Sequence, residues 1–529
     1  MLSGRISVIS IISVCIIASI LFFYNLQSRD FWAPDEGDFA EIVTELKDNF
    51  VVPHLNGKPY GEKPPLFYYI VYASKISLPS LKDEASMRVP TALFAFFFII
   101  FTFITIRKVF NKEVAIVTTF ILMTTPLFYW QARYLQVDMI FSCFLAGSLF
   151  FFLWYYNTNR SYYLYLFFFS SGLAFMIKGP LSIVLIFPVV FMFLLHEKNF
   201  GILKPGAIFA GIIIFLLVVL PWYISIYFSE GLPYLYENVI RQNLTRFFDA
   251  WSHKRPFYYY LTTLPLDFFP WSLFLPAGIY IAFTKFKADH RLKFFLIWFL
   301  WMFFFLSISS GKISKYMLPL LPSVSIIVSY ALLKKESRYN VVVFSFLSVL
   351  LLILSALLLF YKTDIYKEFL HERVLIGLSC LVVSITTFFL LRRKKLIYIC
   401  LSFFLFMIVC YTIANASLYK KMNSYKSPKP VCEKIKTYIE DGTPWIYYGS
   451  IRGVYMYYSG KQAIHIDEHR KDELQNMTQK LDKFYILTRR RDMNEVEGSL
   501  RSVKTMFEEK VGNTLMVFSY YQKYIQESK

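Results

Sequence analysis

Long apolar runs separated by short polar segments fill most of the first 415 residues. The first run lies within Met1–Tyr24, where Arg5 precedes about 18 apolar residues, enough for a helix to span a bilayer. Because it has no small-residue cleavage site, we expect a retained first span rather than a signal peptide. With the later runs, the pattern predicts about 13 transmembrane helices. The later runs lie at 88–106, 113–131, 138–156, 162–177, 180–195, 206–228, 266–284, 293–309, 316–333, 341–361, 374–391 and 396–415.

The pattern changes after residue 415 to short alternating segments. Helices are predicted at 431–439 and 472–481, and strands at 445–448, 462–466, 484–487 and 515–518. The fold class is therefore mainly α, a polytopic membrane protein with a small α/β domain at the C-terminal end. We predict a transmembrane catalytic domain over 1–415, with outer loops 27–87 and 229–265, and an extracytoplasmic domain over 416–529.

Composition supports a membrane protein and excludes a soluble one. Of the 529 residues, 56% are hydrophobic and 20% aromatic. Five of the six cysteines fall inside apolar runs, so neither a disulfide framework nor metal-ligand spacing is expected. The net charge of +20 comes mostly from short loops between apolar runs, which argues against a nucleic-acid partner.

The basic loops also predict the orientation of the chain. They alternate along the sequence and fall on one side of the membrane if the N-terminus lies on that side. The positive-inside rule makes this side the cytoplasm, which leaves the C-terminal domain outside a plasma (inner) membrane. The polar segments that contain charged candidate residues then lie on the outer face. They include 30–65, 133–138, 178–180 and 311–315.

An acidic segment follows the first run, over Trp32–Glu41. It brings Asp35 and Glu36 close in sequence to His54, Glu62 and Lys63. Part of the pattern is that of a solvated helix, because acids in a first turn complement the helix dipole. That account leaves Asp35 unexplained, since ionisable groups in apolar juxtamembrane settings are functional candidates.

Charged residues at the predicted outer face suggest a phosphate site. Asp35 and Asp138 lie at outer helix ends, and either could serve as a general base. Fixed cations suit a phosphate through charge-assisted hydrogen bonds, although headgroup contact is an alternative for each. Lys178 and Lys312 favour the phosphate interpretation, because each adjoins a glycine in an apolar run. The other outer-face cations are Lys63, Arg133, Arg246 and Lys315.

A base, a phosphate clamp and aromatic walls at the outer face suggest group transfer from a lipid phosphate. Nucleotide sugars are cytoplasmic, so a glycosyl donor used outside has to be carried by a membrane lipid. The C-terminal domain contains no G-x-G-x-x-G, so no nucleotide site is implied.

Several motifs between residues 30 and 320 resemble those of polytopic GT-C glycosyltransferases. The branch is that of lipid A aminoarabinose transferases and protein O-mannosyltransferase-like enzymes. The motifs occur in the order expected for this family. They are Trp32-x-Pro-Asp-Glu-x-x-x-Ala-Glu41, Pro53-x-Leu-Asn-Gly-x-x-Tyr60-x-Glu-Lys-Pro-Pro65, Arg133 to Asp138, Met176-Ile-Lys-Gly-Pro180, Asn243-Leu-Thr-Arg-Phe247 with His253, and Gly311-Lys-x-x-x-Tyr316.

The resemblance implies inversion at a sugar C1 with a polyprenyl phosphate as leaving group. The partners would be a polyprenyl-phosphate-linked sugar donor, an envelope lipid, glycan or protein acceptor, and membrane lipids. Asp35 becomes the leading base, and Asp138 a second acidic member of the site. Further substrate contacts are expected from Glu36, His54, Arg133 and Lys178. The residues implied to hold the lipid phosphate are Tyr60, Lys63, Arg246, Lys312 and Tyr316.

Some alternatives stay open. Glu62 and His253 are a candidate divalent-metal pair, although two ligands do not define a site. The family usually carries Arg-Tyr where this chain has Asp38-Phe39, which leaves sugar and acceptor undecided. A flippase for a lipid-linked sugar is the rival function, although transporters tend to show inverted repeats and broken helices. A scaffold would leave Asp35, Lys63 and Lys312 unexplained.

Overall fold

The computed structural model describes residues 2–334, 337–361, 364–439, 441–468, 470–500 and 503–523. Its contacts divide the chain into two compact units, each described separately below. Unit 1 comprises Met1–Leu26, Gly61–Ile70 and Arg88–Leu418. Unit 2 comprises Gln27–Tyr60, Val71–Met87 and Tyr419–Lys529. The segments after the first helix thus share a unit with the C-terminal residues.

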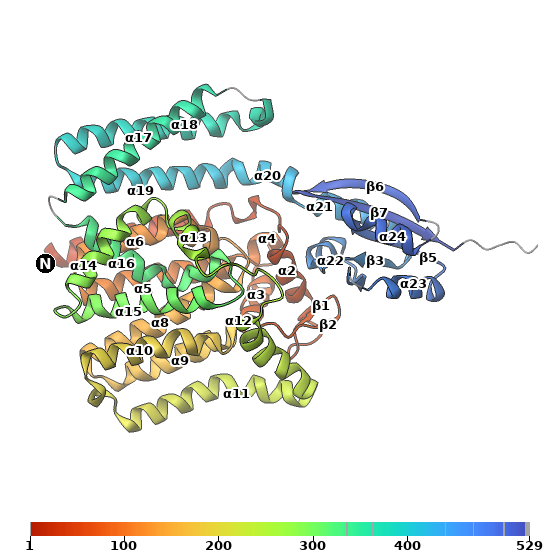
Figure 1. Ribbon diagram of the computed structural model, residues 1–529, viewed down its shortest axis with the longest axis horizontal. Helices are drawn as coiled ribbons and strands as arrows, with labels where there is room; N and C mark the ends of the chain where they lie inside the picture. Colours follow the sequence, from red (N-terminus) through yellow and green to blue (C-terminus); the bar gives the residue numbers. More distant parts are fainter. Residues whose placement is uncertain are drawn as a thin grey trace, which may run out of the picture. The chain divides into compact units, whose positions relative to one another are not determined.

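Unit 1 is built from long apolar helices, as the hydrophobic pattern predicts (Figure 1). Helices α8 and α9 are antiparallel neighbours, α11 packs on α9, and α17 packs on α18. The helices of this unit are α1 (Leu2–Phe23), α5 (Val89–Val109), α6 (Lys112–Thr124), α7 (Pro126–Ala132), α8 (Val137–Thr158), α9 (Ser161–Lys178), α10 (Leu181–Glu197), α11 (Pro205–Leu235), α12 (Arg246–Phe248), α13 (Tyr259–Asp267), α14 (Leu275–Thr284), α15 (His290–Ile308), α16 (Leu321–Leu332), α17 (Arg338–Phe360), α18 (Leu370–Arg392) and α19 (Leu396–Ile413).

The number of spans differs from the prediction. Within the described residues, nine helices are long and apolar enough to cross a membrane, or up to eleven if each of two bent pairs is one span. The helix pair α6 and α7 bends by 69° next to Pro126, and the pair around Pro270 bends by 114°. Proline removes a helical hydrogen bond and restricts the residue before it, so both apolar runs break there. The count of thirteen is not confirmed, whereas the mainly helical, polytopic fold class is.

Short helical segments complete unit 1 and position its polar residues. The π-helical segment η3 (Tyr236–Thr245) continues α11 into α12, and the 3-10 segment η5 (Ser314–Leu320) leads into α16. The remaining short segments are η2 (Phe200–Ile202), η4 (Trp271–Phe274), η6 (Asp364–Phe369) and η7 (Ala414–Leu418).

Unit 2 contains a five-stranded sheet in the order β4-β3-β5-β7-β6. Strand β3 (Trp445–Tyr448) pairs in parallel with β4 (Ile464–Ile466) and β5 (Lys483–Arg489), whereas β7 (Thr514–Gln522) runs antiparallel to β5 and β6 (Val503–Val511). The four predicted strands correspond to β3, β4, β5 and β7, while the sequence pattern did not identify β6. Every residue of β3 is buried, so both faces of its part of the sheet are covered.

The helices of unit 2 are short. Helices α23 and α24 contribute to the apolar core on one face of the sheet, which includes Ile446, Ile486 and Val517. Besides these, unit 2 contains a two-stranded hairpin of β1 and β2. Its remaining elements are the end of η1 (Leu26–Ser28), α2 (Asp35–Glu45), β1 (His54–Leu55), β2 (Lys58–Pro59), the end of α3 (Leu66–Ser77), α4 (Asp83–Ser86), α20 (Tyr419–Lys426), α21 (Lys429–Ile439), α22 (Gly453–Ser459), α23 (Lys471–Lys480), η8 (Arg490–Asp492) and α24 (Met493–Ser499).

Candidate functional site

A buried ion pair joins the last residue of α9 to the first turn of α8. Lys178 Nζ donates to Asp138 Oδ1 at 2.5 Å, and the two side chains are 6% and 2% exposed. The pair forms because α8 and α9 are antiparallel, which brings the start of one beside the end of the other. A buried charge requires such a partner, since removing either member leaves the other uncompensated in an apolar setting. Asp138 therefore holds Lys178 in place.

The turn after Lys178 is surrounded by other candidate segments. Gly179 has a φ of +67°, which a glycine adopts without strain. A Cβ at this position would lie 3.6 Å from Asn243 Nδ2 and 4.0 Å from Pro64 Cγ. The Lys-Gly-Pro, Glu-Lys-Pro-Pro and Asn-Leu-Thr-Arg motifs, distant in sequence, thus meet at this turn.

Lys63 lies in the electrostatic field of this group. Burial lowers the pKa of its ammonium to about 8, and the positive charges of Arg246 and Lys178 act in the same direction, while Glu62 and Asp138 oppose them. The residue as a whole is half-buried, and the ammonium is its desolvated part. An amine so placed gains from a bound anion, which would replace lost hydration and offset the neighbouring cations.

Arg246 supplies a third cation. Its Nη1 donates to Gln242 Oε1 at 3.0 Å and lies 3.8 Å from Glu62 Oε2, with a fifth of the side chain exposed. Its guanidinium also stacks 5.3 Å from the Trp251 ring centroid, and Arg241 stacks at the same distance. Trp251 was not identified from the sequence. Its place four residues before the Arg255-Pro256 dipeptide, in the long loop with His253, is a signal only in retrospect.

Tyr316 provides an aromatic face beside Lys178. The Lys178 ammonium lies 4.8 Å from the Tyr316 ring centroid and 5.0 Å from that of Phe141. These contacts hold the ammonium between two rings and Asp138. Unit 1 thus brings six of the predicted site residues together. We call them the cation cluster: Glu62, Lys63, Asp138, Lys178, Arg246 and Tyr316.

Lys312 and Arg133 make contacts with backbone carbonyls instead. Lys312 Nζ donates to the carbonyls of Ser309 and Arg255, the latter at 3.0 Å. Arg133 is buried, and its guanidinium donates to the carbonyls of Leu21, Phe22 and Tyr24 at 2.8 to 3.1 Å. Arg133 therefore satisfies carbonyls left free at the end of α1. Both side chains stabilise the scaffold, so neither is included in the cation cluster.

The acidic motif lies in unit 2. Asp35 is the first residue of α2 and is partly exposed. Glu36 is fully buried and forms a two-point ion pair with Arg29, at 2.9 and 3.0 Å. Arg29 in turn stacks 4.9 Å from the Trp32 ring centroid. These contacts fix the backbone of the Pro-Asp-Glu motif. Glu36 therefore has a structural role beside Asp35.

Asp38 occupies a position where the family usually carries arginine, and in this structure it has a structural role. Its Oδ1 accepts a hydrogen bond of 2.6 Å from the backbone nitrogen of Gly453, the first residue of α22. A carboxylate at a helix N-terminus complements the free N–H groups and the dipole. A Cβ at Gly37 would lie 2.1 Å from the Cβ of Val454, so α2 and α22 pack closely. Asp38 thus belongs to the packing of unit 2.

The remaining predicted residues of unit 2 lie at the hairpin. The His54 ring pairs through Nδ1 with the Val52 carbonyl at 2.7 Å, and Tyr60 N donates to the Pro53 carbonyl at 2.7 Å. Both interactions shape the β1–β2 turn.

Glu62 and His253 were predicted as a candidate pair of metal ligands. Across the described residues, no group of three or more His, Cys, Asp or Glu side chains could hold a metal ion. Glu62 lies near Arg246, as described above. The backbone carbonyl of His253 accepts a 3.0 Å hydrogen bond from Lys312 N.

The chain is similar in sequence to known membrane transferases. A family model described as dolichyl-phosphate-mannose-protein mannosyltransferase matches residues 62–224. An undecaprenyl phosphate-alpha-4-amino-4-deoxy-L-arabinose arabinosyl transferase of Proteus mirabilis is 27% identical over 62% of this chain and 60% of its own length. Another from Pseudomonas fluorescens is 26% identical over 68% of this chain and 67% of its own length. The matches therefore span about two thirds or less of these relatives.

The fold comparison covers nearly the whole chain. The crystal structure of ArnT from Cupriavidus metallidurans bound to undecaprenyl phosphate has a TM-score of 0.78, with 17% identity over 96% of this chain and 97% of that one. The chain is thus a polytopic membrane protein with the GT-C glycosyltransferase fold. The resemblance predicted from its motifs is confirmed, because a protein-mannosyltransferase family model and aminoarabinose-transferase relatives both match this chain.

Proposed function

We propose that the protein is an inverting glycosyltransferase that moves a sugar from a polyprenyl-phosphate donor to a cell-envelope acceptor. The observation that carries this proposal is the cation cluster, in which Lys63, Lys178 and Arg246 converge at one end of apolar helices. Three cations beside two carboxylates leave a net positive charge, which suits a phosphate. The relatives named above are described as transferases with an undecaprenyl phosphate-linked sugar.

The cluster would act on the leaving group. As the acceptor oxygen bonds to the sugar C1, the bond from C1 to the phosphate oxygen breaks and its electron pair stays on the phosphate. Fixed cations that bind this developing charge lower the barrier most when they are already in place. The buried Lys178–Asp138 pair and the stacked Arg246 are held in this way. The acceptor proton passes to a general base, for which Asp35 is our candidate from its motif.

The donor sugar is proposed only as a class, a pentose or a hexose on a polyprenyl phosphate. The acceptor is proposed as lipid A or another envelope lipid, a glycan or a protein. Relatives at 26 and 27% identity carry 4-amino-4-deoxy-L-arabinose in their names. The Asp38-Phe39 departure lies beside the candidate base, so sugar and acceptor are assigned by experiment.

The charge pattern also supports an orientation in which the cation cluster faces outward. We propose a cytoplasmic N-terminus and an extracytoplasmic unit 2 in a plasma (inner) membrane. A reporter enzyme that works only outside the cytoplasm is expected to be active when fused to the C-terminus. Activity of a cytoplasm-only reporter at that position would contradict the orientation.

The direct test uses purified protein and polyprenyl-phosphate sugars of several kinds. Mass spectrometry would follow release of free polyprenyl phosphate, with and without envelope lipid extract. Release that depends on the extract supports the transferase, and the product mass identifies sugar and acceptor. Passage of the donor across vesicle bilayers without release from any donor would contradict it and favour a flippase.

A further inference from the structure

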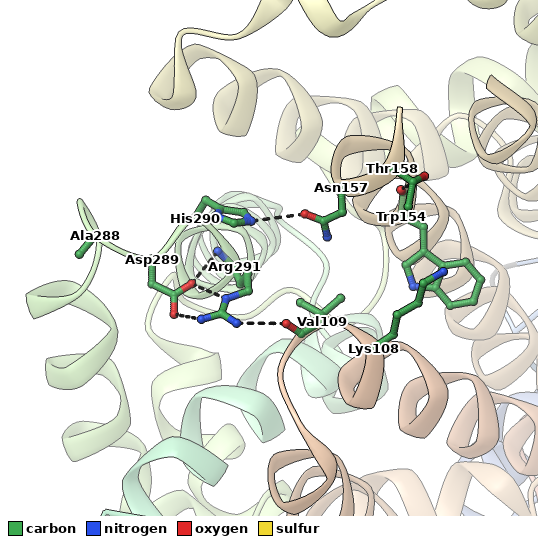
Figure 2. Close-up of a pocket in the computed structure, with 9 residues that line it drawn as sticks. All are labelled: Lys108, Val109, Trp154, Asn157, Thr158, Ala288, Asp289, His290 and Arg291. Carbon is green, nitrogen blue, oxygen red and sulfur yellow. Dashed lines mark hydrogen bonds and ion pairs between the residues drawn. The ribbon is translucent and has the colours of Figure 1, made fainter. Parts of the chain in front are cut away.

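A pocket lies at the other end of α8 from Asp138. It has a volume of about 610 Å³ and is formed where the end of α5, the end of α8 and the start of α15 meet (Figure 2). This volume falls within the usual range for ligand sites. The lining residues are Lys108, Val109, Trp154, Asn157, Thr158, Ala288, Asp289, His290 and Arg291.

The pocket lies where three candidate membrane spans begin or end. Val109 ends one candidate span, Thr158 ends a second, and His290 begins a third. Helix α8 has 22 residues, or about 33 Å at 1.5 Å each, close to the thickness of a bilayer core. The pocket and Asp138 of the cation cluster thus lie at opposite ends of a helix about as long as a bilayer core is thick.

One side of the pocket is fixed by internal pairing. Figure 2 shows Arg291 between Asp289 and the carbonyl of Val109. Its guanidinium bonds both Asp289 oxygens at 2.9 Å and the Val109 carbonyl at 3.2 Å. Asp289 thereby neutralises Arg291. His290 Nε2 pairs with Asn157 Oδ1 at 3.4 Å and links α15 to α8.

The other side carries an available cation. Lys108 Nζ lies 4.3 Å from the Trp154 ring centroid and 5.1 Å from that of Tyr163, and it donates to Tyr163 Oη at 3.2 Å. In Figure 2 its side chain runs along the indole. Among the described residues it forms no ion pair, so its charge is held at the pocket without a counter-charge. Two aromatic faces orient the ammonium.

Trp154 contributes an unsatisfied donor at the same place. Its Nε1 is buried, and no acceptor of the described residues bonds to it. Buried donors are nearly always paired, so an unpaired one in a pocket wall is a place for an acceptor from a ligand. An ammonium over the indole ring and an indole N–H on the same residue are two donor groups of the kind that bind phosphate oxygens.

We propose that this pocket binds the phosphate headgroup of an anionic membrane phospholipid. Three apolar spans end around it, and lipid phosphates lie at that depth. A free phosphate has the same chemistry, so the test separates the two sources. The proposal does not depend on the proposed function, because it concerns the opposite end of the helices. The bound headgroup would link the ends of α5, α8 and α15.

The experiment is native mass spectrometry of the purified protein with phosphatidylglycerol and, separately, phosphatidylcholine, together with thermal unfolding in each lipid. The protein is expected to retain phosphatidylglycerol preferentially and to unfold at a higher temperature with it, because a ligand of the folded state stabilises it. Lys108→Ala should weaken retention about fivefold, as expected for one interfacial lysine. Lys108→Arg should retain the lipid.

Two further variants make the test specific. Lys287→Ala removes an exposed lysine from the loop before α15 that does not line the pocket, and it should leave retention unchanged. Trp154→Phe keeps an aromatic ring but removes the N–H, and it should weaken retention at a temperature where the lipid-free variant is fully folded. Equal losses in Lys108→Ala and Lys287→Ala, or equal binding of the two lipids, would overturn the proposal. Displacement of the lipid by millimolar inorganic phosphate would overturn the lipid assignment.

Discussion

Lys178 and Asp138 form a buried ion pair, with 2.5 Å between Nζ and Oδ1, at the point where α9 ends and α8 begins. Forty residues separate them in sequence. The pair fixes an ammonium beside Lys63 and Arg246, so it is both a structural link between two helices and part of the proposed phosphate site.

Breaking this pair should destabilise the protein. We expect Asp138→Asn and Lys178→Met each to lower the free energy of unfolding by roughly 3–5 kcal/mol, because the remaining charge stays buried without a partner. The double variant Lys178→Met with Asp138→Leu should recover much of that loss but none of the transfer activity. Thermal unfolding in detergent and polyprenyl phosphate release measure the two effects. Single variants as stable as wild type would contradict the pairing.

Lys63 should make donor binding depend on pH. Its pKa is lowered to about 8, so the free protein carries this charge below that pH and loses it above. Donor affinity should therefore fall as pH rises through about 8, and Lys63→Ala should bind roughly tenfold more weakly at neutral pH, without this step. Lys63→Arg should keep affinity at higher pH, because arginine stays charged.

The matched control for Lys63 is Lys254→Ala. Lys254 is exposed and pairs at 2.6 Å with Asp249 on the surface of the same unit, so its removal should leave donor affinity unchanged. The measurement is the donor dissociation constant of wild type and of each variant as a function of pH. The same pH step in Lys63→Ala would assign the titration to another group.

Asp35→Asn should abolish turnover while donor binding is retained. An amide cannot accept the proton of the acceptor, and loss of a general base typically lowers the rate 10²- to 10⁴-fold (about 3–5 kcal/mol). Asp48→Asn is the control, since Asp48 is exposed and lies just beyond the same helix. Comparable turnover in a folded Asp35→Asn protein would remove Asp35 as the base.

Arg133→Ala should act on stability rather than on substrate affinity. Its guanidinium donates to three carbonyls at the end of α1, and hydrogen bonds from a charged donor contribute about 1.5–3 kcal/mol each. We expect a loss of at least about 3 kcal/mol, with an unchanged donor dissociation constant for the fraction that remains folded. A weaker donor constant at unchanged unfolding temperature would instead support a substrate contact.

Much of the scaffold follows from the sequence. The length and hydrophobicity of each apolar run are local properties, and they determine whether a helix can span the bilayer. The run at 138–156 became α8, and the Lys178-Gly-Pro180 break separates α9 from α10 as predicted. The strand at 445–448 matches β3. At Pro126 and Pro270 the hydropathy pattern predicted a single continuous span in each case. In the structure each apolar run is instead bent into two helical segments.

The use of each charged side chain was decided by the tertiary structure. The sequence selected Lys178 and Lys312 by the same argument, namely a charge beside a glycine in an apolar run, and Arg133 as another outer-face cation. The structure pairs Lys178 with Asp138, whereas Arg133 binds carbonyls of α1 and Lys312 binds those of Ser309 and Arg255. The reason is physical. A charge inside an apolar stretch of sequence will need a partner when it is buried. Which partner it finds depends on the helix ends and loops that the tertiary structure brings beside it.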